Sequence, residues 1–456
     1  MTTPAGITWF WEALEHAAPR EMLWRDGRAH SYGELLAAVA DWEARLEGGG
    51  VARHARVAIV GEFGFEPIAL LLALIRREAV IVPLANDDAA SIAERVQTAG
   101  VQVVVDFRDG AELRAVADAA AAAHPLIEEC ARQATAGIVM FTSGSTGKGK
   151  AVLYRADHLI GKFRDAAKKP HRTLLFLKFD HIGGLNTLFA VLSAGGTVVS
   201  GESRQAEDIC RLVQEARVSL LPTTPSFLSM LVMSGRHEQF DLGSLEVITY
   251  GTEVMPQSTL LAVARLFPRV KLKQTYGLTE LGILGTVSRA NDSKWVKLGG
   301  DGVEWKVVDG TLRIRTATPM VGYLNAPSPF DAAGWYDTED QVEVDGEYLK
   351  FLGRKSEVIN VGGEKVHPQE VEDVLLAMPN VAEVRVRGAS SPVTGQTVCA
   401  DVVLRTEEDL RAFRRRLRAY CADKLARYKI PTQVRLSESR FTGSRLKKVR
   451  RTEDAA

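Results

Sequence analysis

Up to residue 300, short apolar runs alternate with segments whose apolar positions follow helical spacing. The runs that predict buried strands lie at 56–60, 79–84, 101–105, 173–179, 197–200, 218–221 and 245–250. The main helical patterns between them lie at 66–74, 91–99, 185–194 and 204–216. Ser31 precedes another helical pattern as a capping residue. Strands and helices that alternate with short connections predict a mostly parallel sheet covered by helices.

The pattern changes after residue 300 to short strands and tight turns. Strand patterns at 304–308, 312–315 and 321–325 predict a small antiparallel unit. Beyond residue 364, helices and strands are mixed, with helices predicted at 368–377 and 407–425 and strands at 381–386, 397–403 and 433–436. This last part reads as a small α+β domain.

One loop between two strand patterns carries candidate chemistry. An apolar run from Ile138 ends at Thr142, and the apolar pattern resumes at Ala151. The residues between them are serine, threonine, glycine and lysine. Glycines let backbone N–H groups approach an anion, hydroxyls add hydrogen-bond donors, and lysine adds positive charge. We therefore expect a strand, a phosphate-binding loop and a second strand that form a hairpin over a triphosphate.

Two other interpretations of this loop are weaker. Gly144 to Lys150 has the G-x-x-x-x-G-K spacing of a mononucleotide-binding P-loop, but that motif needs serine or threonine where Ala151 stands. A P-loop must also open a helix, whereas residues 151–154 have a strand pattern. A solvated Gly/Ser linker is the other alternative, and the flanking strand patterns argue against it.

Composition and charge narrow the class of protein. With 456 residues, 46% hydrophobic and 25% charged, the chain is expected to be a globular protein of more than one domain. Lys+Arg and Asp+Glu both number 57, which gives no reason to expect nucleic acid or an anionic membrane as a partner. No apolar run reaches the roughly 20 residues that span a bilayer, and the N-terminus lacks a signal pattern.

The cysteines give no sign of a disulfide framework or a metal site. They are scattered without C-x-x-C spacing, at Cys130, Cys210, Cys399 and Cys421. We expect them to be reduced, semi-buried thiols of a cytoplasmic protein.

Two further loops are predicted at the carboxyl ends of strands, at 250–256 and 274–280. Ligands bind outside the carboxyl ends of strands in sheets of this type. Glu280 in the second loop offers the carboxylate oxygen that a hard cation prefers beside phosphates. The alternative for this loop is a type I turn that holds a hydrogen-bonded glutamate.

The sequences of these loops resemble motifs of a known enzyme family. Phe-Thr-Ser-Gly-Ser-Thr-Gly-Lys-Gly-Lys at 141–150 resembles the phosphate loop of the AMP-forming adenylating enzymes, the superfamily of acyl- and aryl-CoA synthetases, peptide-synthetase adenylation domains and luciferases. Gly149 stands where the family usually has proline. Tyr-Gly-Leu-Thr-Glu at 276–280 resembles the family's Y-G-x-T-E motif. The resemblance extends over residues 30–450, with the motifs in the family's order.

The resemblance implies roles for individual residues. Tyr276 would stack on adenine, Thr279 would bind phosphate, and Glu280 would take part in Mg²⁺ binding. The segment at 334–340 resembles the family's G-W-x-x-T-G-D, which implies that Asp340 hydrogen-bonds the ribose hydroxyls. An aspartate with a purely structural role at a turn is the alternative.

The segment at 351–372 resembles the family's hinge and the opening of its C-terminal domain. Arg354 matches an arginine that contacts ribose or phosphate. Ser356 stands at the hinge position, which is commonly aspartate or lysine, about which the C-terminal domain rotates between two half-reactions. Gly362 and Gly363 match glycines near which the pantetheine thiol passes.

The basic tail at 445–451 corresponds to the part of the family that carries the catalytic lysine. Lys448 fits the local sequence pattern and Lys447 fits the spacing from the Tyr-Lys-Ile-Pro segment, and we favour Lys448. Without the resemblance, this tail reads as a solvated end or a nucleic-acid patch.

The fold that follows is α/β. A large N-terminal domain at 1–354 has mostly parallel, helix-flanked sheets and a small antiparallel unit, and a small mobile α+β domain at 355–456 carries the lysine. The residues implied in nucleotide or pantetheine binding are Thr142, Ser143, Gly144, Ser145, Thr146, Gly147, Lys150, Gly251, Thr252, Glu253, Thr275, Tyr276, Gly277, Thr279, Asp340, Arg354, Gly362 and Gly363.

The activity implied by the resemblance is an AMP-forming acid–thiol ligation. A carboxylate attacks the α-phosphate of Mg·ATP, pyrophosphate leaves, and a thiol then displaces AMP from the acyl-adenylate. Such chemistry needs positioning and charge neutralisation rather than a protein nucleophile. His181 matches a position beside the acid pocket, as a gate or carboxylate neighbour, and a purely structural histidine is equally consistent with the sequence.

Apolar residues near these positions favour an apolar or aromatic acyl group, namely Phe179, Ile182, Leu185, Phe227 and the stretch 281–285. Asp180 is the only candidate that we find for binding an α-amino group. Since no carrier domain follows Lys448, we expect an external acceptor: coenzyme A first, the phosphopantetheine of a separate carrier protein second, and an amine third. A non-catalytic nucleotide-binding regulator is the alternative from another class.

Overall fold

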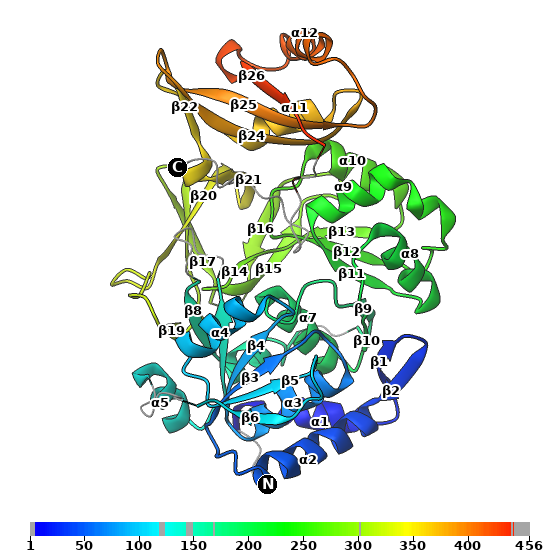
Figure 1. Cartoon of the computed structure of the whole chain (residues 1–456), viewed down its shortest axis with the longest axis vertical. Helices are drawn as coiled ribbons and strands as arrows, with labels where there is room; N and C mark the ends of the chain where they lie inside the picture. The colour runs from blue at the N-terminus through cyan, green and yellow to red at the C-terminus, as the bar shows by residue number, and fades with distance from the viewer. Residues whose placement is uncertain are drawn as a thin grey trace.

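The computed structural model describes residues 5–117, 124–142, 149–166, 169–300, 302–438 and 441. It has a large body and a smaller C-terminal part, which lies at the top of Figure 1. No helix in these ranges is both long enough and apolar enough to cross a bilayer. The α/β fold predicted from the apolar pattern is confirmed.

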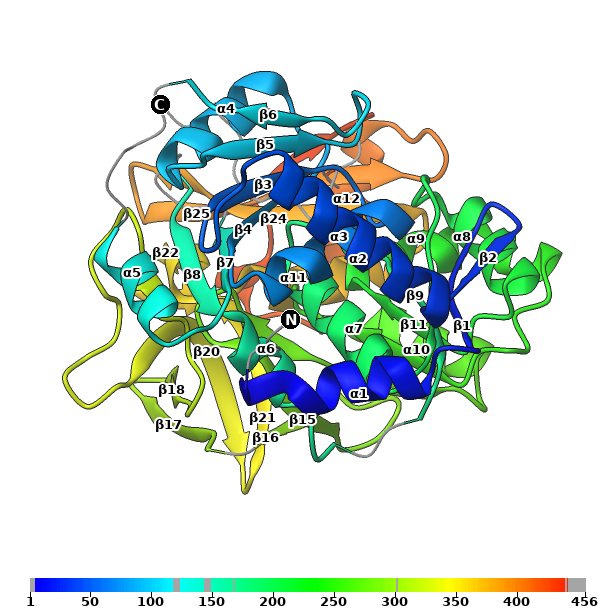
Figure 2. The same cartoon turned by 90° about the horizontal axis from the view of Figure 1, so that it is seen from below.

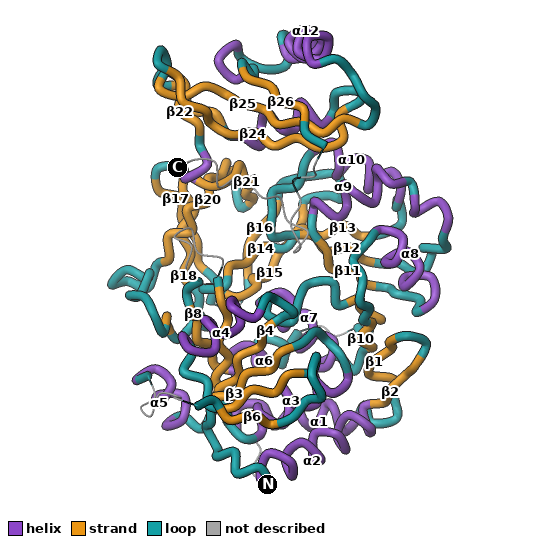
Figure 3. The backbone as a smooth tube through the Cα atoms, viewed as in Figure 1, coloured by secondary structure: helices purple, strands orange, loops and turns teal. Residues whose placement is uncertain are grey.

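Two sheets of seven strands form the centre of the large body (Figure 3). The first contains, in spatial order, β19 (Gly322–Tyr323), β8 (Ala151–Arg155), β7 (Gly137–Phe141), β4 (Val80–Leu84), β3 (Arg56–Val60), β5 (Val103–Asp106) and β6 (Leu113–Ala115). The second contains β13 (Lys271–Gln274), β12 (Val247–Tyr250), β11 (Leu220–Thr223), β9 (Arg172–Leu174), β10 (Thr197–Val199), β1 (Glu21–Arg25) and β2 (Arg28–Ser31). Most neighbouring strands in both sheets are parallel. The antiparallel pairs are β7 with β8, β8 with β19, and β5 with β6 in the first sheet, and β1 with β2 in the second.

Helices pack on these sheets, and the buried residues of helices and sheets form several hydrophobic cores. The helices of the large body are α1 (Thr8–His16), α2 (Tyr32–Gly48), α3 (Phe65–Arg76), α4 (Ala89–Thr98), α5 (Pro125–Arg132), α6 (Ala156–Gly161), α7 (Ile182–Ser193), α8 (Ala206–Glu215), α9 (Pro225–Ser234) and α10 (Gln257–Leu266). α3 is buried along its length because its sequence is apolar on nearly every side. Its residues join those of α1, α2, α7 and both sheets in the largest core, and Figure 2 shows the N-terminal helices of this group.

The N-terminus of α2 confirms the predicted cap. The Ser31 hydroxyl accepts a hydrogen bond from the Glu34 N–H at 3.1 Å, and the Glu34 carboxylate accepts one from the Ser31 N–H at 2.6 Å. This capping box satisfies two backbone donors that a helix start otherwise leaves unpaired.

A third sheet forms the predicted antiparallel unit. Its strands, in spatial order, are β14 (Tyr276–Leu278), β15 (Gly282–Ser288), β16 (Val296–Gly299), β21 (Tyr348–Arg354), β20 (Tyr336–Asp345), β18 (Thr311–Arg315) and β17 (Glu304–Val308). The prediction that 321–325 belongs to this unit is wrong. Gly322 and Tyr323 pair instead with Leu153 and Val152, because backbone hydrogen bonds from Val321 and Leu324 fix this segment to the free edge of β8.

The C-terminal part has a sheet and a core of its own. The sheet contains β23 (Glu364–Val366), β22 (Ile359–Val361), β25 (Gly395–Leu404), β24 (Val381–Ser391) and β26 (Gln433–Leu436), accompanied by α11 (Pro368–Leu376) and α12 (Leu410–Cys421). The predicted α+β character is confirmed. We propose that the domain boundary lies between Arg354, where β21 ends, and Lys355, where a short 3₁₀ turn begins.

The strand predicted at 173–179 is shorter than expected, since β9 ends at Leu174. The residues after Leu174 are mostly apolar because the chain passes from one hydrophobic core to another in this segment. Phe176 packs edge-on against Phe227 in one core, and Phe179 packs against Phe63 in the other. Periodicity cannot distinguish such a crossing from a buried strand.

Candidate active site

A cleft of about 1940 Å³ separates the large body from the C-terminal domain and extends into the body. Its walls come from the loops after β12 and β13, from strands β14, β15, β20 and β21, and from α6, α7, α11 and β24. The predicted site residues that line it are Thr142, Lys150, His181, Gly251, Thr252, Glu253, Thr275, Tyr276, Gly277, Thr279, Glu280, Asp340 and Arg354. The fold thus brings residues from distant parts of the sequence to one cavity.

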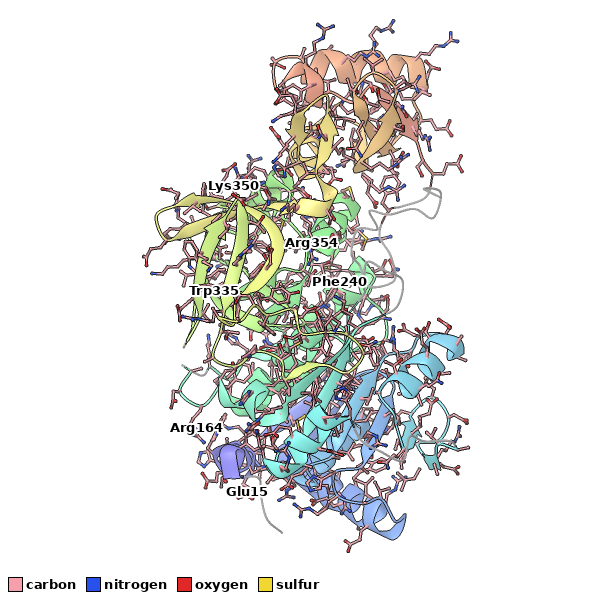
Figure 4. The ribbon with its side chains drawn as sticks, turned by 90° about the vertical axis from the view of Figure 1, so that its left-hand side faces the viewer. Glu15, Arg164, Phe240, Trp335, Lys350 and Arg354 are labelled. Atoms are coloured by element: carbon pink, nitrogen blue, oxygen red, sulfur yellow. The ribbon has the colours of Figure 1, made fainter. Side chains whose placement is uncertain are left out.

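An aromatic and acidic cluster forms one wall of this cleft. The Tyr276 ring stacks on Phe351, with centroids 4.5 Å apart and planes 19° apart, and its hydroxyl donates to Asp340 Oδ2 at 2.6 Å. Asp340 is the β-ladder partner of Arg354, whose Nε lies 3.5 Å from Asp340 Oδ1. Burial raises the pKa of the Asp340 carboxyl, and the neighbouring Arg354 charge opposes this rise. Figure 4 shows Arg354 near the junction of the two domains.

A second cluster joins the other two motifs. The Tyr323 hydroxyl donates to Glu280 Oε1 at 2.7 Å, and Lys150 Nζ lies 5.0 Å from the centroid of the Tyr323 ring. Glu280 is only 8% exposed. Tyr323 therefore contacts both the Glu280 carboxylate and the Lys150 ammonium, and it holds these two groups in the same part of the cleft.

Asn325 fixes both flanks of the predicted phosphate loop. Its side chain accepts from the Ala151 N–H at 2.9 Å and donates to the Gly149 carbonyl at 3.0 Å. The Thr142 N–H also donates to the Lys150 carbonyl at 3.0 Å, which closes the hairpin of β7 and β8. The sequence did not indicate Asn325 and Tyr323 as site residues, because no local pattern links 321–325 to residues so far away along the chain.

The two strand-end loops lie side by side. β12 and β13 are parallel neighbours in register at Tyr250 and Gln274, and the Thr275 N–H donates to the Tyr250 carbonyl at 2.7 Å. A Cβ on Gly251 would collide with the Thr275 side chain and carbonyl, so only glycine fits this approach. Glu253 accepts a hydrogen bond from the Ser226 hydroxyl at 2.8 Å.

His181 is the N-cap of α7. Its Nδ1 accepts from the Gly183 N–H at 3.0 Å, which leaves Nε2 as the protonated nitrogen of the neutral ring. Asp180 forms an ion pair with Arg95 at 3.4 Å and is not among the residues that line the cleft. This pairing argues against Asp180 as the partner of an α-amino group.

The apolar lining predicted for the acid pocket is partly wrong. Ile182 and residues 281–285 line the cleft, but Phe179, Leu185 and Phe227 do not. Those three side chains are fully buried in the cores on either side. Their apolar character reflects packing rather than ligand binding.

Some predicted residues are not brought to the cleft. Gly362 and Gly363 form the exposed turn between β22 and β23, where φ angles of 60° and 97° suit glycine, and they do not line it. The candidates Ser143, Gly144, Ser145, Thr146, Gly147, Lys447 and Lys448 lie outside the described residues.

The carboxylates of the cleft limit how a metal could be held. In the ranges that the structure describes, no three histidine, cysteine, aspartate or glutamate side chains are grouped as a metal-binding set. Glu280 offers a largely buried carboxylate, and its oxygen accepts from Tyr323, the residue whose ring lies next to Lys150. This donor set fits a magnesium ion whose remaining ligands are phosphate oxygens and waters.

Comparison with known proteins agrees with this geometry. The family described as AMP-binding enzyme matches residues 10–324, and the family described as AMP-binding enzyme C-terminal domain matches residues 370–445. An indoleacetate–CoA ligase from Aromatoleum aromaticum is 30% identical over 89% of this chain and 88% of its own length. A 4-chlorobenzoate–CoA ligase from a Pseudomonas species is 31% identical over 78% of this chain and 71% of its own.

Solved structures show the same fold. The crystal structure of the anthranilate–CoA ligase AuaEII in complex with anthranoyl-AMP superposes with a TM-score of 0.83, at 18% identity. The match covers 98% of this chain and 95% of that one, so both the large body and the C-terminal domain have counterparts.

Proposed function

Since the chain belongs to the AMP-binding enzyme family, we propose that it activates a carboxylic acid with ATP and passes the acyl group to the thiol of coenzyme A. The convergence of Lys150, Thr279 and Glu280 with Asp340 and Arg354 in one cleft supports this activity. Cationic, hydroxyl and carboxylate groups of these kinds suit the binding of a nucleoside triphosphate and its metal ion.

In the first half-reaction, a carboxylate oxygen of the acid attacks the α-phosphorus of ATP. The bond to the bridging oxygen breaks, and pyrophosphate leaves with the electron pair. Lys150 offsets phosphate charge, and Thr279 donates a hydrogen bond to a phosphate oxygen. Tyr276 and Asp340 hold the adenosine, by stacking and by accepting from the ribose hydroxyls. Magnesium bound through Glu280 would neutralise further phosphate charge.

In the second half-reaction, the thiol sulfur attacks the acyl carbon of the mixed anhydride. The bond from this carbon to the phosphate oxygen breaks, AMP leaves, and the thiol proton is released. Gly362 and Gly363 do not line the cleft in this structure, so we propose that the C-terminal domain rotates near Ser356 to bring their turn to the acid. Lys448, or Lys447, serves the first half-reaction from the tail.

The acid has an apolar or aryl body. Ile182, Ile283 and Leu284 line the cleft on the side of α7, and they offer apolar contact to such a group. Coenzyme A is the first choice of acceptor, and the phosphopantetheine arm of a separate carrier protein is the second. An amine acceptor is the third.

Acid-dependent exchange of pyrophosphate into ATP tests the activity. Aryl acids, fatty acids of several lengths and amino acids form the panel, and we expect exchange with one class of acid. Lys150→Ala should lower this exchange by about a hundredfold, since it removes a charge that faces the phosphates. Lys306→Ala is the matched control, because Lys306 packs over Trp335 outside the cleft.

Two outcomes separate the alternatives. ATP binding without exchange for any acid would favour a non-catalytic nucleotide-binding protein. Where exchange occurs, mass spectrometry after addition of coenzyme A identifies the acceptor by the mass of the thioester. Exchange without a thioester would point to a carrier protein or an amine.

A further inference from the structure

Lys162 is a cation inside the cleft that the proposed chemistry does not use. It follows the last residue of α6 and lines the cavity, as does His158 one helical turn earlier. β8 leads from Lys150 to α6, and its five residues span about 16 Å. The α6 end of the cleft is therefore remote from the phosphate loop.

The contacts of Lys162 do not neutralise its charge. Its ammonium donates to the Ile283 carbonyl at 3.2 Å and lies 5.2 Å from the centroid of the Phe163 ring. No carboxylate in the described part of the chain forms an ion pair with it. Water reaches the side chain from the open cleft, yet the surrounding protein desolvates the ammonium and lowers its pKa to about 8. An ammonium that lines a cleft without a counterion can form a charge-assisted contact with a ligand that supplies the negative charge.

Two polar side chains that line the same cleft each have a buried atom without a hydrogen-bond partner. His158 Nδ1 and Asn186 Oδ1 are buried, and neither forms a hydrogen bond with any described residue. Asn186 lies on α7, which packs against both α6 and β15, and it lines the cleft with His158 and Lys162. Buried polar atoms normally find partners, so a polar ligand group is expected here.

The surroundings of these groups are apolar. Leu159 and Phe163 lie within three residues of Lys162 in sequence, and Ile182, Ile283 and Leu284 also line the cleft. A ligand that fills this region must combine an apolar body with a charged end.

We propose that Lys162 determines the specificity of the acid pocket by binding an anionic group at the end of the substrate opposite the carboxylate that is activated. The substrate is then a dianionic acid, such as a dicarboxylate, with an apolar or aryl body. This inference rests on the proposed function. A charge-assisted contact to Lys162 supplies the missing counterion, and His158 and Asn186 provide hydrogen bonds at the same end.

Matched pairs of acids test the inference in the exchange assay. The pairs are terephthalate with 4-methylbenzoate, adipate with hexanoate, and suberate with octanoate, which differ mainly in the second carboxylate. We expect kcat/KM of the wild type for at least one dicarboxylate to exceed that of its partner about tenfold or more, as expected for one charge-assisted hydrogen bond. Lys162→Met should remove this preference while changing kcat/KM for the neutral-ended acid less than about twofold.

Arg164→Gln is the matched control. Arg164 is an exposed cation two residues away that donates to the Gly6 carbonyl at 3.1 Å, and Figure 4 shows it at the surface of the large body. This variant should keep the preference of the wild type. Equal or higher kcat/KM for every neutral-ended partner would overturn the inference, and so would equal losses for both members of a pair in Lys162→Met.

Calorimetric titration of each dicarboxylate into the ATP-free protein separates this inference from the proposed function. One outcome is dicarboxylate binding that Lys162→Met weakens about tenfold or more, with no exchange for any acid. This result would support the anion site and overturn the ligase activity. Exchange confined to neutral-ended acids would support the ligase and overturn the anion site. Absence of both exchange and Lys162-dependent binding would overturn both.

Discussion

At the scale of single residues, polar groups in the cleft form hydrogen bonds and ion pairs with one another. A bound ligand can replace one of the partners in such a contact. Tyr276 donates to Asp340, and Asp340 faces Arg354 across two neighbouring strands. Ribose hydroxyls can take the place of the tyrosine hydroxyl as donors to the carboxylate. The Asp340 carboxylate is positioned for these hydroxyls because Asp340 lies within strand β20 and not in a turn.

Replacing Asp340 should therefore weaken ATP binding. We expect Asp340→Ala to raise KM for ATP about tenfold or more, the value for losing a charged acceptor, with a smaller effect on kcat. Asp345→Asn is the control, since Asp345 lies on the same strand but pairs with Arg289 on the surface. Equal effects of both substitutions on KM in the exchange assay would contradict the assigned role.

The cysteines give a second prediction at this scale. All four are buried and free, and burial raises the pKa of the Cys130, Cys210 and Cys421 thiols to about 11 because it disfavours the charged thiolate. At pH 8 only about one such thiol in a thousand is ionised. We expect little reaction of the native protein with Ellman's reagent at this pH, and reaction of every thiol after unfolding in guanidinium. Rapid release of one equivalent from the native protein would be inconsistent with these buried sites.

At the scale of elements, the hairpin of β7 and β8 is completed by β19. Tyr323 on β19 contacts both the Glu280 carboxylate and the Lys150 side chain, and Asn325 just beyond it holds the loop flanks. The orientation of the phosphate loop thus depends on a strand that is far from it in sequence.

We expect Asn325→Ala to raise KM for ATP several-fold and to lower the free energy of unfolding by about 1–2 kcal/mol, because two backbone groups lose their partner. Asn291→Ala is a matched control, since Asn291 also bonds two backbone groups, at Leu272 and Val270, but does not line the cleft. It should cost similar stability in urea unfolding without changing KM. A change in KM as large as that of Asn325→Ala would show that stability alone explains both variants.

At the scale of the whole molecule, one ion pair connects the two domains beside the cleft. Lys294 follows β15 in the large body, and its ammonium lies 2.7 Å from Asp373 on α11, with both side chains largely buried. Gln369 donates to the other oxygen of this carboxylate at 2.9 Å. This ion pair favours the orientation that the C-terminal domain has in this structure over an orientation in which that domain is rotated.

Removing this pair should free the C-terminal domain. We expect Lys294→Met to speed cleavage after Glu357, in the connection between the domains, about fivefold, which corresponds to about 1 kcal/mol. A glutamate-specific protease and mass spectrometry of the fragments measure this rate. Lys297→Met, which breaks an exposed pair with Glu347 inside the antiparallel unit, should leave the rate unchanged. Equal rates in both variants would show that Lys294 does not restrain the domain.

The sequence by itself determined the elements and the local chemistry. Period-two and helical patterns predicted most strands and helices, since each depends on neighbours a few residues apart. The composition of the loop after Phe141 predicted phosphate binding, and the helical pattern after Ser31 predicted a capped helix, which the structure has. The motifs at 276–280 and 334–340 indicated the groups that the cleft later brought together.

Only the tertiary structure decided which distant residues meet. The pairing of Gly322 with Leu153 places Tyr323 and Asn325 beside the phosphate loop, and no local pattern encodes a register between strands so far apart. Likewise, Phe179 and Phe227 were predicted to line the acid pocket but are buried in the cores, while Lys162, for which the sequence predicted no role, lines the cleft. Burial depends on which elements pack over a side chain, and that packing is set by the whole chain rather than by its neighbours in sequence.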